Sequence, residues 1–178
     1  MIPASFDYCA PASMDEVMRA IEEHSDDFRV LAGGQSLIPM MKLRLSNPGF
    51  LIDLRLVSEL DSIAYDNGVL VLGAMTSYRS IEPSPIVAQH SPILRDIASK
   101  VADVQVRNRG TIGGAIAHAD PAGDMSAGLI AAKGVVTVQG PSGRRNLSAD
   151  EFFVDAYTTE LSDDEILVEF RFPAVGTT

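Results

Sequence analysis

Cysteine is almost absent from the 178-residue chain, which contains Cys9 alone. A single thiol cannot form an internal disulfide, and an iron–sulfur cluster needs several cysteines, so neither is expected within this chain. No apolar run approaches the roughly 20 residues that a membrane span requires. Residues 1–12 also lack the basic start and the long apolar segment of a secretion signal. These absences predict a cytoplasmic protein.

Positive charge is scarce as well. The chain has 14 Lys and Arg residues against 24 Asp and Glu residues, for a formal net charge of -10. No basic stripe is present that could replace the counterions around a phosphate backbone, so nucleic acid is excluded as a partner. The acidic residues are spread along the chain, which is typical of a solvated surface. Function must therefore be sought in local motifs.

The first 55 residues read as a small lobe of alternating helices and strands. Ser13 and Glu16 form a capping box, and apolar residues at helical spacing predict a helix that runs to about His24. Glycine and proline then divide the sequence into further segments. These are a strand over 28–31, a glycine turn over 32–36, a helix over 37–45 interrupted near Pro39, and a strand over 50–54. We expect a β-α-β-like lobe over residues 1–55.

The remaining residues, 56–178, predict a second lobe in which hairpins and helices alternate. The expected elements are a hairpin (63–65 and 69–72) around Asp66-Asn67-Gly68, helices over 77–81 and 92–102, a segment 104–106 that leads into a second glycine turn over 110–114, a helix over 125–133, a hairpin (135–139 and 144–147), a capped helix from Ser148, and a strand over 166–172. This order indicates an α+β fold whose second lobe has a mixed or antiparallel sheet, rather than a doubly wound parallel sheet.

The two glycine turns are candidate anion sites. Glycine tolerates positive φ and close approach of a ligand, so successive amide N–H groups at Gly33-Gly34 and at Gly113-Gly114 can point outward together. Ser36 and Thr111 add a hydroxyl to each turn. Each hydrogen bond to a charged group contributes about 1.5–3 kcal/mol, whereas distant carboxylates are screened beyond about 8 Å. The alternative is that both glycine pairs only make tight turns. Neither turn has three spaced glycines or a P-loop lysine, which disfavours nicotinamide and triphosphate sites.

Three motifs, in this order and spacing, resemble the FAD-binding medium subunit of the molybdenum hydroxylases, a family that includes carbon monoxide dehydrogenase and xanthine dehydrogenase. The motifs are VLAGGQSLIP over 30–39, RNRGTIGG over 107–114 and DPAGD over 120–124. The resemblance extends over essentially the whole chain. It implies FAD as cofactor and a two-lobed FAD-binding domain of the PCMH/vanillyl-alcohol-oxidase type.

The resemblance also implies a set of cofactor-binding residues, with no catalytic or metal-ligating residue among them. They are Ala32, Gly33, Gly34, Gln35, Ser36 and Leu37 in the first motif, Thr111, Ile112, Gly113 and Gly114 in the second, Gly123 and Asp124 in the third, and Leu167. Both glycine motifs would bind the FAD pyrophosphate. Asp124 would accept hydrogen bonds from flavin-side hydroxyls, or serve only as a helix cap. Leu167 would pack near the flavin, or only in the core.

This chain departs from the family in two ways. Ala115 stands where the family usually has Asn, so one side-chain amide is missing. Family members also continue past the last strand into a further domain, whereas this sequence stops at Thr178. A truncated subunit, a split gene or a shortened chain would each explain the difference.

By resemblance, the chain is an oxidoreductase flavoprotein that takes electrons from a [2Fe-2S] iron–sulfur subunit and passes them to a quinone, NAD or oxygen. A molybdopterin subunit would complete a heterotrimer, arranged as an (αβγ)2 complex, and would act on carbon monoxide, an aldehyde, a purine or another N-heterocycle. Two alternatives stay open. One is a stand-alone FAD-dependent oxidoreductase, and the other is a scaffold that has lost flavin and uses residues 40–45 as an interface. Arg107 and Arg109 either meet phosphate or a partner, or are solvated.

Overall fold

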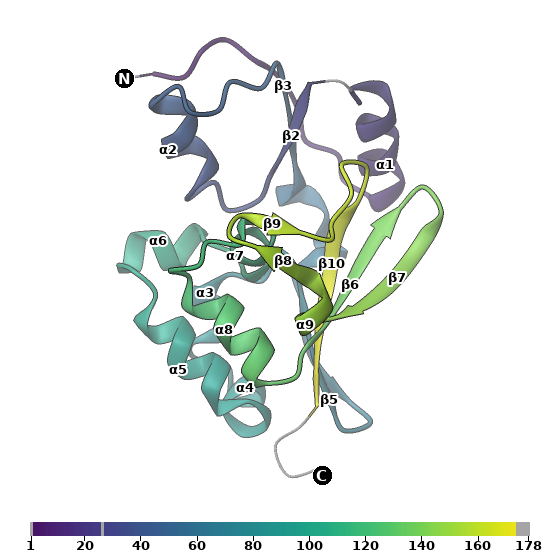
Figure 1. The fold of residues 1–178 in the computed structure, drawn as a ribbon. Helices are drawn as coiled ribbons and strands as arrows, with labels where there is room; N and C mark the ends of the chain where they lie inside the picture. Colours follow the sequence, from purple (N-terminus) through teal and green to yellow (C-terminus); the bar gives the residue numbers. More distant parts are fainter. Residues whose placement is uncertain (1, 26, 174–178) are drawn as a thin grey trace.

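A parallel three-stranded sheet forms the core of the first part of the chain. The computed structural model describes residues 2–25 and 27–173. The strands are β1 (Asp7–Cys9), β2 (Phe28–Leu31) and β3 (Phe50–Asp53), in the order β1-β3-β2, with α1 (Met14–Glu23) and α2 (Leu37–Lys42) as the intervening helices. Both strand pairs are parallel, which requires crossover connections of this kind. Figure 1 shows this sheet at the upper end of the molecule.

The two helices of this part follow from their first residues. The Ser13 side chain accepts a hydrogen bond from the Glu16 amide, and Met14, Val17 and Ile21 of α1 are buried. The predicted interruption of the next helix is wrong, because Pro39 lies in the first turn of α2, where its missing N–H would have no helical partner. This helix ends at Lys42 rather than at residue 45.

A five-stranded antiparallel sheet forms the second part, in the order β4-β5-β10-β6-β7. Its strands are β4 (Ile63–Asp66), β5 (Val69–Gly73), β6 (Val135–Gly140), β7 (Gly143–Ser148) and β10 (Ile166–Pro173). Both predicted hairpins are confirmed. Asn67 and Gly68 have φ angles of 48° and 84°, as a two-residue type I′ turn requires.

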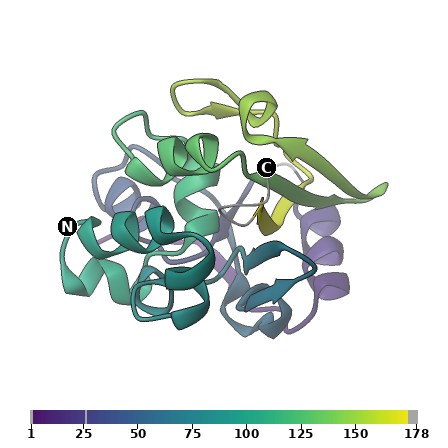
Figure 2. The ribbon, with the colours of Figure 1, turned by 90° about the horizontal axis from the view of Figure 1, so that it is seen from below.

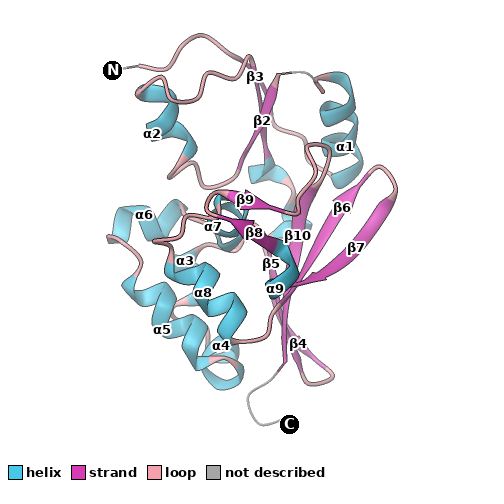
Figure 3. Cartoon of the chain, in the orientation of Figure 1, coloured by secondary structure: helices cyan, strands magenta, loops and turns pink. Residues whose placement is uncertain are grey.

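Helices cover one face of this sheet (Figures 1 and 3). They are α3 (Tyr78–Ile81), α4 (Pro85–His90), α5 (Pro92–Lys100), α6 (Val104–Arg109), α7 (Ile112–His118) and α8 (Asp124–Ala131). Later in the chain follow α9 (Ala149–Phe152) and a small two-stranded sheet of β8 (Phe153–Asp155) and β9 (Thr158–Thr159). Two short 3-10 helices, Leu54–Leu56 and Ser58–Leu60, join the two sheets. In the view from below, α1 lies on the opposite side of the molecule from α5, α6 and α8 (Figure 2).

The segment around the second glycine pair differs from the prediction. Residues 104–109 form helix α6, because the Asp103 side chain accepts a hydrogen bond from the Val106 amide at 2.9 Å and caps it. Gly113 and Gly114 are not in a turn, but in the first turn of α7 behind the cap Thr111. Of the four glycines in the two pairs, only Gly34 has a positive φ, of 74°.

Strand β10 joins the two parts of the fold. Its Ile166 and Val168 pack with α1 and the first sheet, whereas Leu167, Phe170 and Phe172 belong to the core beneath the other helices. A bulge between Leu167 and Glu169 shifts the register against β6. The C-terminal strand is therefore buried on both faces. We keep the division into lobes 1–55 and 56–178 as a proposal, since the two sheets separate there although β10 contacts both cores.

Candidate functional site

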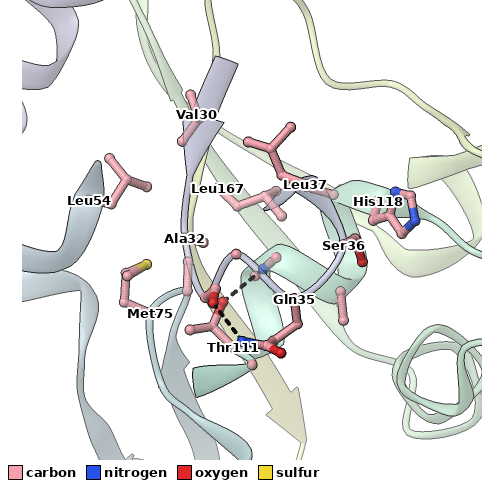
Figure 4. Close-up of a pocket in the computed structure, with 18 of the residues that line it drawn as sticks. Val30, Ala32, Gln35, Ser36, Leu37, Leu54, Met75, Thr111, His118 and Leu167 are labelled. Carbon is pink, nitrogen blue, oxygen red and sulfur yellow. Dashed lines mark hydrogen bonds between the residues drawn. The ribbon is translucent and has the colours of Figure 1, made fainter. Parts of the chain in front are cut away.

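A cavity of about 750 Å³ lies between the first sheet and the helical layer. Ligand pockets in proteins usually fall between about 300 and 1,000 Å³. Its wall is formed by the segment after β2, by residues that follow β5, by α6 and α7 with the loops around them, and by the start of β10. Figure 4 shows Val30, Ala32, Ser36 and Leu37 along β2 and the loop that follows it, with Thr111 and Leu167 nearby.

The first glycine segment contains a row of backbone N–H groups that make no hydrogen bond to a described residue. The amide N–H groups of residues 33–37 donate to no acceptor among the described residues. The Ser36 side chain likewise makes no capping hydrogen bond. The bend itself is stabilised through its carbonyl groups, since Gln35 Nε2 donates to Gly33 O at 3.3 Å and the Ile38 amide donates to Gly34 O at 3.1 Å. Five successive free amides beside a cavity suit a bound anion.

The second glycine segment does not present its amides, and that part of the prediction is wrong. The Ile112 amide donates to Thr76 O at 3.0 Å, and the Gly113 amide donates to Ala74 O at 2.8 Å. The Gly114 amide donates to Thr111 Oγ1 at 3.1 Å. Because this oxygen accepts from Gly114, the Thr111 hydroxyl proton is left as the donor toward the cavity.

The two glycine segments meet at one end of the cavity. A Cβ on Gly33 would lie 2.1 Å from the carbonyl oxygen of Arg109, and one on Gly113 would lie 2.5 Å from that of Ala74. One on Gly114 would be 3.5 Å from the Ala32 side chain. Gly33 and Gly113 are thus needed for close packing of backbones rather than for positive φ. This packing brings the free amides of the first segment next to the Thr111 hydroxyl.

Ten of the thirteen predicted site residues line the cavity. They are Ala32, Gly33, Gly34, Gln35, Ser36, Leu37, Thr111, Gly113, Gly114 and Leu167. Ile112 is fully buried in the core, and its packing there fixes the position of its neighbours Thr111 and Gly113. Gly123 is the N-cap of α8 and Asp124 is its exposed first residue, and neither is part of the cavity wall.

Several wall residues were missed by the sequence analysis. Asp120 is one of them, and its Oδ1 accepts from the Ala122 amide at 2.9 Å and from Tyr157 Oη at 3.2 Å.

Tyr78 is another wall residue, and it is 4% exposed. Burial, and secondarily the negative charge of Asp124, raises the pKa of Tyr78 to about 12. No local motif marks Tyr78, because only the tertiary fold brings it to the cavity.

Glu165 completes the wall next to β10. Arg145 Nε and Nη2 donate to its two carboxylate oxygens at 2.7 and 2.6 Å, and the Ser162 amide donates to Oε2 at 3.0 Å. These bonds, led by that from Arg145, lower the pKa of Glu165 to about 2. Arg145 Nη2 also donates to Glu160 O at 2.7 Å. One guanidinium thus fixes the loop that enters β10.

The two arginines of the second motif have different environments. Arg107 Nη1 donates to Val101 O at 3.1 Å and to Ala102 O at 3.2 Å, and Nε lies 3.4 Å from a carboxylate oxygen of Glu82. Arg107 therefore holds the loop before α6, a loop that forms part of the cavity wall. Arg109 is exposed and lines a second, neighbouring cavity of about 520 Å³ together with Arg55.

Other classes of site have less support. Within residues 2–25 and 27–173, no three His, Cys, Asp or Glu side chains are arranged to hold a metal ion. In the same residues, no helix has the length and apolar character that crossing a membrane would take. His118 is half-buried in the cavity wall, where its ring centroid lies 5.3 Å from that of Tyr157.

Comparison with known proteins identifies the family. Residues 4–175 match the family model described as the FAD binding domain in molybdopterin dehydrogenase. The chain belongs to this family. The FAD-binding domain is also recognised in three dimensions, since a solved carbon monoxide dehydrogenase from Hydrogenophaga pseudoflava superposes with a TM-score of 0.97 at 45% identity, covering 99% of this chain and 62% of the other. The predicted α+β, PCMH-type fold and the predicted cofactor, FAD, are confirmed.

Other relatives carry names with different substrates. Quinoline 2-oxidoreductase from Pseudomonas putida 86 superposes with a TM-score of 0.96 at 39% identity, covering 99% of this chain and 61% of its own. The caffeine dehydrogenase subunit beta of Pseudomonas sp. (strain CBB1) is 38% identical over 97% of this chain and 59% of its own length. The curated medium chain of the Hydrogenophaga enzyme is 45% identical over 98% of this chain and 61% of its own length. The chain thus spans about three-fifths of the length of these relatives.

The cavity fits FAD on chemical grounds. The free amides of residues 33–37 and the hydroxyls of Ser36 and Thr111 are the donors that a diphosphate needs. Gly113 and Gly114 line the cavity at the start of α7. Strand β10 supplies the apolar side chain of Leu167. The wall therefore combines a compact anion site with an apolar surface.

Proposed function

We propose that this chain is the FAD-binding part of an electron-transfer subunit in a cytoplasmic molybdenum hydroxylase complex. In this role FAD receives electrons from a [2Fe-2S] iron–sulfur subunit and passes them to an external acceptor. A molybdopterin subunit oxidises the substrate, and the three subunits form an (αβγ)2 complex. The single observation that carries the proposal is the row of five free amides that lines one cavity together with the Thr111 hydroxyl.

The pyrophosphate is assigned to the first glycine segment. Residues 33–37 supply backbone N–H groups and the Ser36 hydroxyl, and Thr111 adds a hydroxyl from the adjoining segment. A hydrogen bond to a charged group contributes about 1.5–3 kcal/mol, so a few of these donors outweigh the screened repulsion from the acidic surface. Gly113 and Gly114 leave room for the ligand, while buried Ile112 supports them from beneath.

The remaining site residues are assigned to the flavin side. Leu167 offers an apolar contact from β10. Gly123 and Asp124 lie at the start of α8, outside the cavity wall, so their contact to FAD hydroxyls requires the cofactor to extend beyond the cavity toward this helix. Bound FAD supplies the redox chemistry, and the chain binds it, orients it and excludes water from it. No general acid, base or nucleophile is needed from this chain.

The substrate is assigned to another subunit. Relatives named for carbon monoxide, quinoline and caffeine share this domain at 45%, 39% and 38% identity. A domain that is so similar across three different substrates is poorly suited to select among them. The open set for this protein accordingly includes carbon monoxide, aldehydes, purines and other N-heterocycles.

A binding experiment tests the cofactor site. The purified protein, freed of flavin, is titrated with FAD, FMN and riboflavin while flavin fluorescence is recorded. We expect FAD to bind at least about tenfold more tightly than FMN, a difference of about 1.4 kcal/mol, because FMN lacks the pyrophosphate. Equal affinity for FAD and FMN would contradict the assignment of the glycine segments.

The Thr111→Val variant tests the second donor, with Thr137→Val as its matched control. Both threonines are 5% exposed, but the Thr137 hydroxyl donates to Asn146 Oδ1 on the outer hairpin, away from the cavity wall. We expect Thr111→Val to weaken FAD binding about tenfold and Thr137→Val to leave it unchanged. Unfolding curves of both variants without FAD separate lost stability from lost binding.

An electron-transfer experiment distinguishes the proposal from its alternatives. The complex is reduced with substrate, or its iron–sulfur subunit is reduced chemically, and bleaching of the flavin is followed by stopped flow. We expect the iron–sulfur signal to recover as the flavin is reduced. Flavin that binds but takes no electrons from the iron–sulfur subunit indicates a stand-alone oxidoreductase, and a chain that binds no flavin indicates a scaffold.

A further inference from the structure

Tyr78 is a buried polar residue that has no role in the FAD site proposed above. It begins α3 and is 4% exposed within the core of the second sheet. Its amide donates to Gly110 O at 3.1 Å, and a Cβ on Gly110 would lie 3.1 Å from its ring. The ring is thus held against the residue that precedes Thr111. Tyr78 also forms part of the wall of the large cavity.

The hydroxyl of Tyr78 makes no hydrogen bond to a described residue. Burial and the negative charge of Asp124 raise the pKa of this hydroxyl, and no hydrogen bond is among the causes. Across the described residues, no fully enclosed side-chain oxygen or nitrogen lacks a partner, so the hydroxyl must reach accessible space. Since the rest of the side chain is packed in the core, the cavity is the accessible space that this tyrosine borders.

A hydroxyl in this position needs a partner once the cavity is filled. In the ligand-free protein it can exchange hydrogen bonds with water, but a dinucleotide that displaces the water must replace those bonds. Burial keeps the group protonated, because its pKa is raised to about 12. It therefore acts as a donor at every physiological pH. FAD carries oxygen acceptors along its whole length, on its phosphates, its sugar chains and its ring.

We propose that Tyr78 Oη donates a hydrogen bond to an oxygen atom of bound FAD and so positions the cofactor in the cavity. The inference rests on the proposed function, because it takes FAD as the occupant. It adds a side-chain contact from α3, an element that none of the three sequence motifs includes. The glycine segments hold the diphosphate through the backbone, whereas Tyr78 contacts FAD from the helical layer of the second sheet.

The test compares Tyr78→Phe with Tyr65→Phe in the full protein. Phenylalanine keeps the packed ring and removes only the hydroxyl. Tyr65 is the control for loss of a tyrosine hydroxyl outside the cavity wall, where its ring stacks on His90 with centroids 3.5 Å apart. The dissociation constant for FAD is measured by fluorescence titration at pH 7. We expect it to rise about tenfold for Tyr78→Phe and to stay within about twofold for Tyr65→Phe.

A second measurement keeps the outcome interpretable if Tyr78→Phe changes stability. The rise in melting temperature that saturating FAD produces is recorded for each variant relative to its own flavin-free form. We expect a smaller rise for Tyr78→Phe than for the wild type. If the wild type binds FAD and Tyr78→Phe has the same dissociation constant, this inference alone is overturned. A wild-type protein that does not bind FAD overturns the proposed function instead.

Discussion

Replacing Gly33 by alanine tests the contact that joins the two glycine segments. The new Cβ would lie 2.1 Å from Arg109 O, 2.8 Å from Arg109 C and 2.9 Å from Gly110 Cα. All three are backbone atoms, so no side-chain rotation can relieve the overlap. Ordinary contact begins at 3.4 Å, and the segments must therefore separate by about 1.3 Å, the difference between 3.4 Å and 2.1 Å.

The expected cost follows from this separation. Forcing extra atoms into a close-packed site destabilises a protein by about 1–3 kcal/mol. Replacing glycine by alanine also stiffens the unfolded chain, which recovers only about 0.4–1 kcal/mol. We expect Gly33→Ala to lower the free energy of unfolding by about 2 kcal/mol. Because the amides of residues 33–37 move away from Thr111, we expect FAD affinity to fall at least about tenfold.

Denaturant titration gives the stability of the flavin-free variant, and fluorescence titration gives its affinity for FAD. Gly68→Ala is the control, because Gly68 has a φ of 84° and nothing within 4 Å of an added Cβ. This control carries backbone strain of about 1–2 kcal/mol without a clash, and its turn lies outside the cavity wall. Gly33→Ala protein that unfolds and binds FAD as the wild type does would refute the reasoning.

Three further predictions concern other elements. Arg145→Gln removes the partner that holds the pKa of Glu165 near 2, and the variant should lose about 1 kcal/mol of unfolding free energy at pH 7, because Arg145 is 40% exposed. In the wild type, the stabilisation from this ion pair is complete above about pH 4.5 and is lost as the pH falls through about 2. The acid unfolding curves of wild type and variant should therefore converge near pH 2. Ser148→Ala breaks the capping box of α9 and should destabilise the protein by about 1 kcal/mol in thermal unfolding. Ala115→Asn adds an amide to the cavity wall and should lower the dissociation constant for FAD about threefold; weaker binding would show that the site has no room for it.

Features fixed by local chemistry could be predicted from the sequence. The turn at Asn67-Gly68 needs two residues that accept positive φ, and the helix caps Ser13 and Ser148 need only a hydroxyl at the correct spacing. The glycine segments are recognisable for the same reason, because each is a local pair of residues. Their convergence was inferred from pairing and resemblance, and the structure brings them together through the contact of Gly33 with Arg109 O.

Features that depend on distant partners could not be predicted. The amides of Gly113 and Ile112 are occupied by carbonyl groups of Ala74 and Thr76, which follow β5 more than thirty residues earlier in the chain. A glycine pair in the sequence does not reveal whether its amides face a ligand or another strand. The same limit applies to Tyr78, which reaches the cavity only because α3 packs beside Gly110.

The position of β10 explains how one site can depend on two cores. Ile166 and Val168 are buried against the first part of the fold, while Leu167 between them is buried with the second and borders the cavity. The two parts cannot separate there without exposing apolar side chains from both cores, which is unfavourable at about 25 cal/mol for each Å². The backbone contact at Gly33 fixes the other end. A cofactor bound between these two attachments is therefore held in one position, as the proposed electron transfer requires.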